Sequence, residues 1–168
     1  MKLETERLII QEFTINDAPF YYALVNDPDW IKYIGKRNIN SILDAEQYLT
    51  TKIIVSYKKF GFGFYLVKTI VGNHSIGTVG LIDREGMDNV EVGFAFLPAF
   101  RGKGYAYEAT KEIMNYASTE LKIDPIIAIT DLENTKSGKL LERLGLRFDK
   151  NIQLPDFKKP SKLFIPKN

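Results

Sequence analysis

Residues 89–107 constrain the fold of this 168-residue chain most, because an apolar strand pattern runs into a glycine-rich turn. The strand pattern covers 90–97, the turn is Arg101-Gly-Lys-Gly-Tyr-Ala106, and a helical pattern over 103–121 follows directly. Glycines 102 and 104 let the backbone lie close to a ligand. The start of the helix adds unpaired N–H groups and the positive end of its dipole. The segment therefore predicts a pyrophosphate site, with Arg101 and Lys103 adding positive charge at its rim.

Two common kinds of phosphate loop do not fit this turn. A P-loop needs two glycines separated by four residues and then Lys-Ser or Lys-Thr, a pattern that the turn lacks. A dinucleotide fingerprint needs a third glycine at position 107, where Tyr107 stands. A strand–helix turn that binds nothing is the remaining structural alternative for this segment.

Two motifs carry a family resemblance. Arg101-x-x-Gly104-x-Ala106, after a strand that ends in Leu97-Pro98, resembles the acetyl-CoA loop of the GCN5-related N-acetyltransferases, the GNAT superfamily. The segment from Asn134 to Phe148 resembles the second signature of that family, an Asn-x-x-Ser/Ala helix ending in Leu-Gly-Phe. The two motifs stand in the order that the family requires.

The ends of the chain resemble one branch of that superfamily, the RimJ/RimL-like enzymes that modify the N-termini of ribosomal proteins. The segment from Glu4 to Phe13 is similar to the first strand of that branch. Leu154-Pro-Asp156 and Lys162-Leu-Phe164 are similar to its C-terminal strands. The resemblance thus extends over nearly the whole chain, and its middle motifs are the specific part.

The resemblance implies a transferase that moves the acetyl group of acetyl-CoA to a primary amine. Phe94, Ala95, Phe96 and Leu97 would pair with the pantetheine arm, and Arg101, Gly102, Lys103, Gly104, Tyr105 and Ala106 would hold the pyrophosphate. Asn134 and Ser137 would also contact the cofactor, and no metal is expected. Protein N-termini, other peptides, polyamines, amino sugars and xenobiotic amines all remain open as acceptors.

Composition bounds the class of protein. One domain spanning 1–168 is expected, and 45% hydrophobic and 26% charged residues describe an ordinary globular chain. The net charge of +2 gives no bulk electrostatic argument for nucleic-acid or membrane partners. No cysteine is present, which removes disulfides and thiolate catalysis. No run approaches the ~20 apolar residues of a membrane span. We expect a cytoplasmic protein that acts as a monomer or a homodimer.

The patterns along the chain predict an α+β fold. Its mixed, mostly antiparallel sheet of about seven strands would carry helices on both faces. Strands are expected at 7–13, 64–69, 76–82, 90–97, 125–130, 146–154 and 162–165. Helices are expected from about 16 to 26, from 44 to 59, over 103–121, and from Asn134 to Gly145. Asp27-Pro-Asp-Trp30 is expected to break the first helix, leaving Trp30, Tyr33 and Gly35 in a loop or short turn. A helix crossover makes 125–130 parallel to 90–97.

Glu91 is the first candidate for catalysis. Strand alternation places Val90, Val92, Phe94 and Phe96 on one face and Glu91, Gly93 and Ala95 on the other. An amine must lose a proton before it attacks a thioester, and a carboxylate on this strand could accept that proton, directly or through water. The alternative is that Glu91 has no catalytic role and is either a surface residue or one paired with a lysine.

The acid that protonates the leaving thiolate is less defined. Many relatives have a tyrosine three or four residues past the position of Ser137, where this chain has Leu140-Leu141. Ser137, Asn134 or an ordered water are substitutes, although Ser137 also fits as a small residue that lets the helix approach the cofactor. Asn134 is at minimum a helix N-cap.

Other candidates have structural explanations that compete with chemistry. Trp30, Tyr33 and Phe62 could line an acceptor pocket, and they are also ordinary core residues. His74, the only histidine, falls in an expected hairpin tip, and the Asp27/Asp29 pair fits a helix stop better than a cation site. Two other classes of function stay open: an acyl-CoA sensor without turnover, and an interaction domain with a vestigial loop.

Overall fold

The computed structural model describes residues 1–155 and 157–168, so Asp156, which belongs to the C-terminal resemblance, lies outside the described residues. The strands are β1 (Lys2–Glu4), β2 (Leu8–Glu12), β3 (Phe64–Thr69), β4 (Ser75–Ile82), β5 (Glu91–Phe96), β6 (Ala128–Asp131), β7 (Leu146–Ile152) and β8 (Ser161–Pro166). The α-helices are α1 (Ala18–Val25), α2 (Pro28–Tyr33), α3 (Ile42–Tyr48), α4 (Val55–Phe60), α5 (Tyr105–Thr119) and α6 (Thr135–Arg143).

The strands form two sheets rather than the one expected. Five antiparallel strands follow the order β1-β2-β3-β4-β5, and three follow the order β6-β8-β7. The hairpin of β3 and β4 is confirmed, with Gly72 and Asn73 at positive φ in its turn. Strand β1 was not predicted; it pairs with β2 through Leu3 and Ile10. The predicted α+β class is therefore confirmed, with an N-terminal hairpin added to the sheet.

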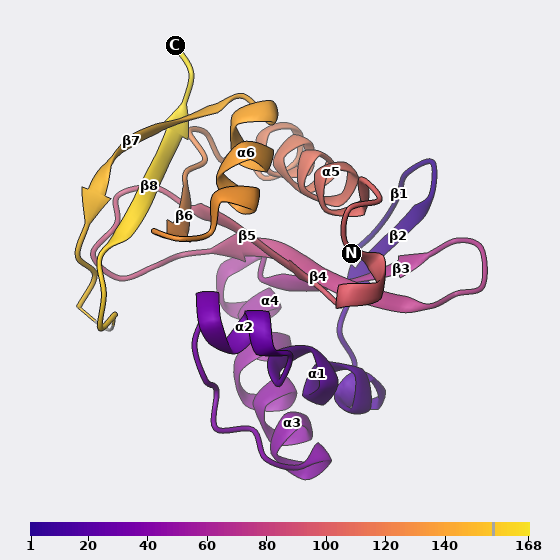
Figure 1. Cartoon of the computed structure of the whole chain (residues 1–168). Helices are drawn as coiled ribbons and strands as arrows, with labels where there is room; N and C mark the ends of the chain where they lie inside the picture. Colours follow the sequence, from indigo (N-terminus) through magenta and orange to yellow (C-terminus); the bar gives the residue numbers. More distant parts are fainter. Residues whose placement is uncertain (156) are drawn as a thin grey trace.

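Helices cover both faces of the five-stranded sheet, as Figure 1 shows, with α5 and α6 on one face and α1 to α4 on the other. One core cluster packs α5 and α6 on the sheet through residues such as Ile10, Val92 and Ile113. The other packs α1 to α3 on the opposite face through residues such as Phe13, Leu24 and Leu66. Phe94 and Phe96 belong to the first cluster and Ala95 to the second, so the alternation predicted for β5 is confirmed.

The first correction concerns Trp30 and Tyr33, which were predicted to lie in a loop or short turn. The break predicted at Asp27-Pro-Asp-Trp30 is confirmed, because α1 ends at Val25. Pro28–Tyr33 is the short helix α2, and Trp30 and Tyr33 belong to it rather than to a loop. Proline is favourable at the first helical position because the N–H that it lacks would be unpaired there. Asp27 caps the helix by accepting a hydrogen bond from the Trp30 N–H at 3.2 Å. The motif that ends α1 therefore also starts α2.

The second correction concerns the helix expected over 44–59. It begins at Ile42, where Ser41 is the N-cap, and continues as α3, a π-helical stretch at Leu49–Ile54, and α4. Gly61 ends it with a φ of 79°. The other predicted helices appear as α5 and α6 within a few residues of their expected limits.

The parallel contact between β5 and β6 is short. Val92 N–H donates to the Ile127 carbonyl at 2.8 Å, and Ile127 N–H donates to the Val90 carbonyl at 3.0 Å. Beyond the single bridge of Glu91 with Ile127, the described part of the chain shows no pairing of β5 with β6, and β6 pairs with β8 instead. The two sheets therefore separate along β5 from about Phe94 onward.

Candidate active site and cofactor cleft

The glycine turn after β5 has the backbone that an anion site requires. Gly102 and Gly104 have φ of 72° and 84°, a region that other residues rarely adopt. Gly104 is the N-cap of α5, and no side chain occupies that capping position. The first N–H groups of a 15-residue helix thus face the turn 101–106, which is the arrangement predicted from the sequence.

Arg7 is a residue at this turn that sequence reasoning missed. Its Nη1 donates to the Lys103 carbonyl at 2.9 Å, and its guanidinium lies 4.5 Å from the centre of the Tyr105 ring. A Cβ added at Gly104 would come within 3.2 Å of Arg7 Nη2. Arg7 therefore supports the turn from the N-terminal hairpin, and the segment around it had stood out only through its family resemblance.

Glu108, one turn into α5, holds Arg7 in place. Its carboxylate accepts from the Thr5 hydroxyl at 2.6 Å, from the Arg7 N–H at 2.9 Å and from Arg7 Nε at 2.7 Å. Burial alone would raise the pKa of Glu108, but these hydrogen bonds and the guanidinium lower it overall. The ionised carboxylate thus ties the hairpin to the start of α5.

The side chain of Arg101 points away from the turn. Nε donates to the Phe96 carbonyl at 2.7 Å, Nη1 to Asp29 at 2.5 Å and Nη2 to Asp27 at 2.5 Å. Both carboxylates come from the start of α2, and Asp27 is buried. The positive charge expected from Arg101 at the rim is therefore engaged by two carboxylates, whereas Lys103 remains exposed beside the Phe100 ring.

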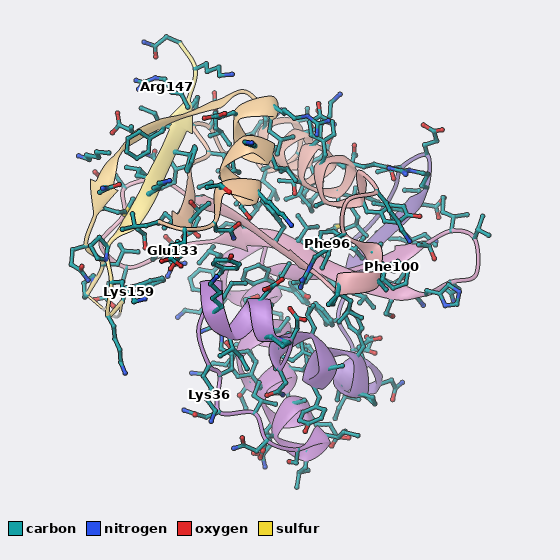
Figure 2. All side chains as sticks on the ribbon, in the orientation of Figure 1. Lys36, Phe96, Phe100, Glu133, Arg147 and Lys159 are labelled. Atoms are coloured by element: carbon teal, nitrogen blue, oxygen red, sulfur yellow. The ribbon has the colours of Figure 1, made fainter. Side chains whose placement is uncertain are left out.

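The open edge of β5 presents backbone groups toward the gap between the sheets. Alternate residues of a strand direct their N–H and C=O groups to the same edge, so Phe94 and Phe96 face the side on which Val92 bonds Ile127. The Phe96 carbonyl already accepts a hydrogen bond from Arg101 Nε. The backbone N–H and C=O of Phe94 and the N–H of Phe96 then remain for an extended ligand. Figure 2 labels Phe96 at the end of β5 and Glu133 just before α6.

Glu91 lies at the closed end of the gap, where β5 still pairs with Ile127. It is 4% exposed, and its Oε2 accepts from Arg84 Nε at 2.6 Å. Burial raises the pKa of Glu91, and the Arg84 guanidinium opposes that rise without cancelling it. Glu91 is neither a surface residue nor paired with a lysine, so both structural alternatives are replaced by a buried pair with arginine. Arg84, from the loop after β4, was not singled out by the sequence.

The start of α6 lies across the gap from β5. Asn134 caps the helix, as predicted, by accepting from the Ser137 N–H at 3.1 Å. Ser137 is half-buried, and Gly138 packs so close to Phe164 that an added Cβ would lie 3.2 Å from its ring. Leu140 is half-buried and Leu141 is buried, so no proton donor stands at the position of the usual tyrosine.

Helix α2 borders the gap from the other face. Trp30 is 7% exposed and packs in the second core cluster, and Tyr33 is half-buried. Among the described residues, the buried side-chain polar atoms without a hydrogen-bond partner are Trp30 Nε1 and Thr130 Oγ1, the latter in β6. Since such atoms are rare in native proteins, a water or a ligand is their usual explanation. Phe62 is a buried core residue.

Among the residues that the structure describes, no group of three or more His, Asp or Glu side chains is placed so that it could hold a metal ion. His74 is exposed in the turn between β3 and β4, as expected. The helices among the described residues are all too short or too polar to cross a membrane.

The fold, the glycine turn at the start of α5 and the separation of β5 from β6 define an acetyltransferase of the GNAT type. The family model described as "Acetyltransferase (GNAT) domain" matches residues 7–147, and the chain belongs to that family. The family therefore establishes acetyl transfer as the activity and acetyl-CoA as the acetyl donor.

Relatives and solved structures agree with this assignment. The uncharacterized N-acetyltransferase p20 of Bacillus licheniformis is 30% identical over 94% of this chain and 87% of its own. A GNAT-family acetyltransferase from Bacillus anthracis has a TM-score of 0.81, 26% identity, and coverage of 98% of this chain and 97% of its own. The ribosomal L7/L12 acetyltransferase RimL, solved with coenzyme A, has a TM-score of 0.84 at 12% identity and shares the fold, with coverage of 98% and 97%.

Proposed function

We propose that this acetyltransferase moves the acetyl group of acetyl-CoA directly to a primary amine, without a covalent enzyme intermediate. The observation that carries the proposal is the juxtaposition of the glycine turn 101–106 with the unpaired edge of β5. A pyrophosphate on the turn would leave the attached pantetheine arm lying along that edge. The arm would then end toward Glu91, about 16 Å along the strand from Phe96 at roughly 3.3 Å per residue.

The residues proposed to hold the cofactor divide into two sets. The backbone of Gly102, Lys103, Gly104, Tyr105 and Ala106 would bind the pyrophosphate, together with the backbone of Arg101. Within the segment Phe94 to Leu97, the N–H and C=O of Phe94 and the N–H of Phe96 would pair with the pantetheine amides as an added strand does. Asn134 and Ser137 would border the same arm from α6.

The chemistry assigns a role to Glu91. The carboxylate would accept a proton from the acceptor ammonium, directly or through a water molecule, and the free amine would attack the thioester carbonyl carbon. The C–N bond forms, and the N–H of Phe94, the nearer of the two to Glu91, would stabilise the oxyanion of the tetrahedral intermediate. Collapse of that intermediate breaks the C–S bond and releases the thiolate, and the nitrogen loses its second proton through water to leave the neutral amide. A raised pKa suits Glu91 to this task, because a base works best when its pKa approaches the working pH.

Protonation of the leaving thiolate has two candidate sources. Ser137 is one, and an ordered water held by Asn134 is the other. The leucines at 140 and 141 cannot donate a proton. A thiolate is already a stable leaving group near neutral pH, so water suffices for this step.

The acceptor is proposed at the level of a peptide N-terminus or a small-molecule amine. Support for a peptide comes from the likeness to the ribosomal-protein acetyltransferases, which is a likeness of fold. The acceptor would enter between α2 and the loop that carries Arg84, since Glu91 faces that side of the sheet. Trp30 and Tyr33 on α2 would form one wall of this entrance.

The experiment that tests the proposal is a panel of amines incubated with acetyl-CoA, followed by the amine-dependent release of free CoA thiol. Release with one class of amine, and acetyl product confirmed by mass, would support transfer to that class. CoA binding by calorimetry without release for any amine would instead favour an acyl-CoA sensor. The absence of a tyrosine at 140–141 is the observation behind that second candidate.

A further inference from the structure

A single side chain joins the cofactor turn to the wall of the acceptor entrance. Arg101 is the first residue of the turn, and its guanidinium contacts the Phe96 carbonyl, Asp27 and Asp29 through three different nitrogens. Asp27 uses the same Oδ2 to accept from Arg101 and from the Trp30 N–H that begins α2. The position of α2 therefore depends directly on the position of Arg101.

The charges around Arg101 argue against a phosphate as its partner. One guanidinium lies between two carboxylates, so the cluster carries a net charge of −1. Asp27 is 7% exposed, which weakens the screening of its charge by water. A phosphate brought to the same guanidinium would be repelled by both carboxylates. The planar fork of arginine already makes bonds from all three of its nitrogens here.

The far end of α2 approaches the other side of the cofactor gap. Lys32 Nζ lies 3.9 Å from Glu133 Oε2, and Glu133 directly precedes the N-cap Asn134. This ion pair is exposed and its N–O distance is long, so by itself it contributes little to stability. Together with the Arg101 cluster, it shows that α2 spans from the glycine turn to the start of α6. The helix thus crosses the entrance through which an acceptor would reach Glu91.

We propose that Arg101 is a positioning residue that couples cofactor binding at the turn 101–106 to the placement of α2 on the acceptor side. It acts through Asp27 and Asp29. This inference rests on the proposed function, because it takes the turn as the CoA site. Cofactor on the turn fixes the backbone of Arg101, which fixes α2 and completes the acceptor entrance. By thermodynamic linkage, if CoA raises the affinity for an acceptor that binds against α2, that acceptor raises the affinity of the turn for CoA by the same factor.

Hydrogen–deuterium exchange with saturating CoA tests the coupling without knowledge of the acceptor. In the wild-type protein, CoA is expected to slow amide exchange in the turn 101–106 and also in residues 29–35. In Arg101→Ala, CoA should still protect the turn, but protection of 29–35 should disappear. The double variant Asp27→Asn/Asp29→Asn should give the same pattern. Adding Arg101→Ala to that double variant should cause no further loss of CoA-dependent protection.

The control variants separate positioning from charge. Lys103→Ala removes a cation from the same turn that touches neither aspartate, so it should leave the CoA-dependent protection of α2 intact. Arg101→Lys keeps the charge but cannot bridge both carboxylates, so it should behave like Arg101→Ala and offers a second variant if the alanine protein does not fold. CoA affinity by calorimetry should change by less than about threefold in each Arg101 variant.

Three results would overturn the coupling alone. One is α2 protection that persists in both Arg101 variants. The second is protection confined to the turn in the wild-type protein, which would leave the cofactor site standing. The third is a CoA affinity that falls tenfold or more in Arg101→Ala but not in the double aspartate variant, since that would place Arg101 on a phosphate. A wild-type turn that CoA does not protect would overturn the proposed cofactor site and the coupling with it.

Discussion

The proposed cofactor and acceptor sites along β5 use different parts of the polypeptide. At the turn 101–106, backbone N–H groups and two glycines at positive φ form the proposed cofactor site, and the surrounding side chains support the backbone. The proposed acceptor side consists of side chains held by other side chains, with Glu91 against Arg84 at the paired end of β5 and α2 anchored by Arg101. A backbone site depends on local geometry, whereas a side-chain site depends on contacts between distant segments. The variants below should separate these two kinds of dependence.

The largest effect is expected at the side-chain site. Glu91→Gln keeps the shape of the residue but removes the proton acceptor, so turnover should fall by roughly 100-fold or more, the usual scale of general-base catalysis. The KM for acetyl-CoA should change little, because the backbone turn is untouched. Steady-state kinetics with a responsive amine measures both quantities.

Glu85→Gln is the matched control for that experiment, since Glu85 is an exposed glutamate in the same loop as Arg84. Its turnover should stay within about twofold of the wild-type value. Full activity of Glu91→Gln at neutral pH would remove Glu91 from the mechanism.

A smaller but still large effect is expected at the backbone site. Gly104→Val forces a β-branched residue to a φ of 84° and places its Cβ near Arg7. Such strain is of order 1–3 kcal/mol, so CoA affinity should fall by roughly 10- to 100-fold while kcat at saturating cofactor changes less. Isothermal calorimetry with CoA gives the affinity.

Gly61→Val provides the control, because Gly61 has a φ of 79°, has open space around it and ends α4 away from the turn. It should cost stability without a matching loss of CoA affinity. Equal CoA affinities in wild-type and Gly104→Val proteins would refute the assignment of the turn.

Arg84 should act on the pH profile rather than on the maximum rate. Arg84→Gln removes the guanidinium 2.6 Å from Glu91, so the rise in the pKa of Glu91 caused by burial is no longer opposed. The acidic limb of the kcat/KM profile should then move to higher pH. An acidic limb that stays in place would show that another group sets it.

The same raised pKa has a consequence for stability. A carboxyl whose pKa is higher in the folded than in the unfolded state contributes stability below its ordinary value of 4.5, and this contribution is lost as the pH rises through the folded pKa. The wild-type protein should therefore lose stability relative to Glu91→Gln as the pH rises through that window. Urea unfolding at several pH values would measure the difference.

The smallest effect is expected for Glu108→Gln, which weakens the support of the turn without touching it. The pKa of Glu108 is lowered in the folded protein. Its contribution to folding stability is therefore present at neutral pH and is lost as the pH falls through that lowered pKa. The variant should lose about 1–2 kcal/mol at neutral pH, the scale of hydrogen bonds to a charged group, and less in acid. The control variant Glu112→Gln, four residues further along α5, should change the free energy of unfolding less. If the stability loss of Glu108→Gln is the same in acid as at neutral pH, the ionised Glu108 carboxylate is not its cause.

The contrast between backbone and side chains also explains what the sequence could predict. Glycines 102 and 104, the strand alternation of β5 and the cap at Asn134 are local features, and each was predicted from residues within a few positions. The pair of Glu91 with Arg84 and the cluster of Arg101 with Asp27 and Asp29 join segments that only the folded chain brings together.

Helix α2 shows where a local rule was applied too simply. Proline and two aspartates correctly suggested the end of α1, but the residues after it form a helix rather than the expected loop. Pro28 occupies the position where a helix best tolerates it, and Asp27 caps that helix. The separation of β5 from β6 has no local sequence signal, because no single residue of either strand determines where pairing stops.

A crystal structure of the protein with CoA tests the account most directly. The account predicts the pyrophosphate on the N–H groups of 102–106, the pantetheine arm paired with Phe94 and Phe96, and the thiol directed toward Glu91. Arg101 should remain on Asp27 and Asp29. A pyrophosphate held elsewhere, or an Arg101 guanidinium that leaves the aspartates to bind a phosphate, would contradict the division between a backbone cofactor site and a side-chain acceptor site.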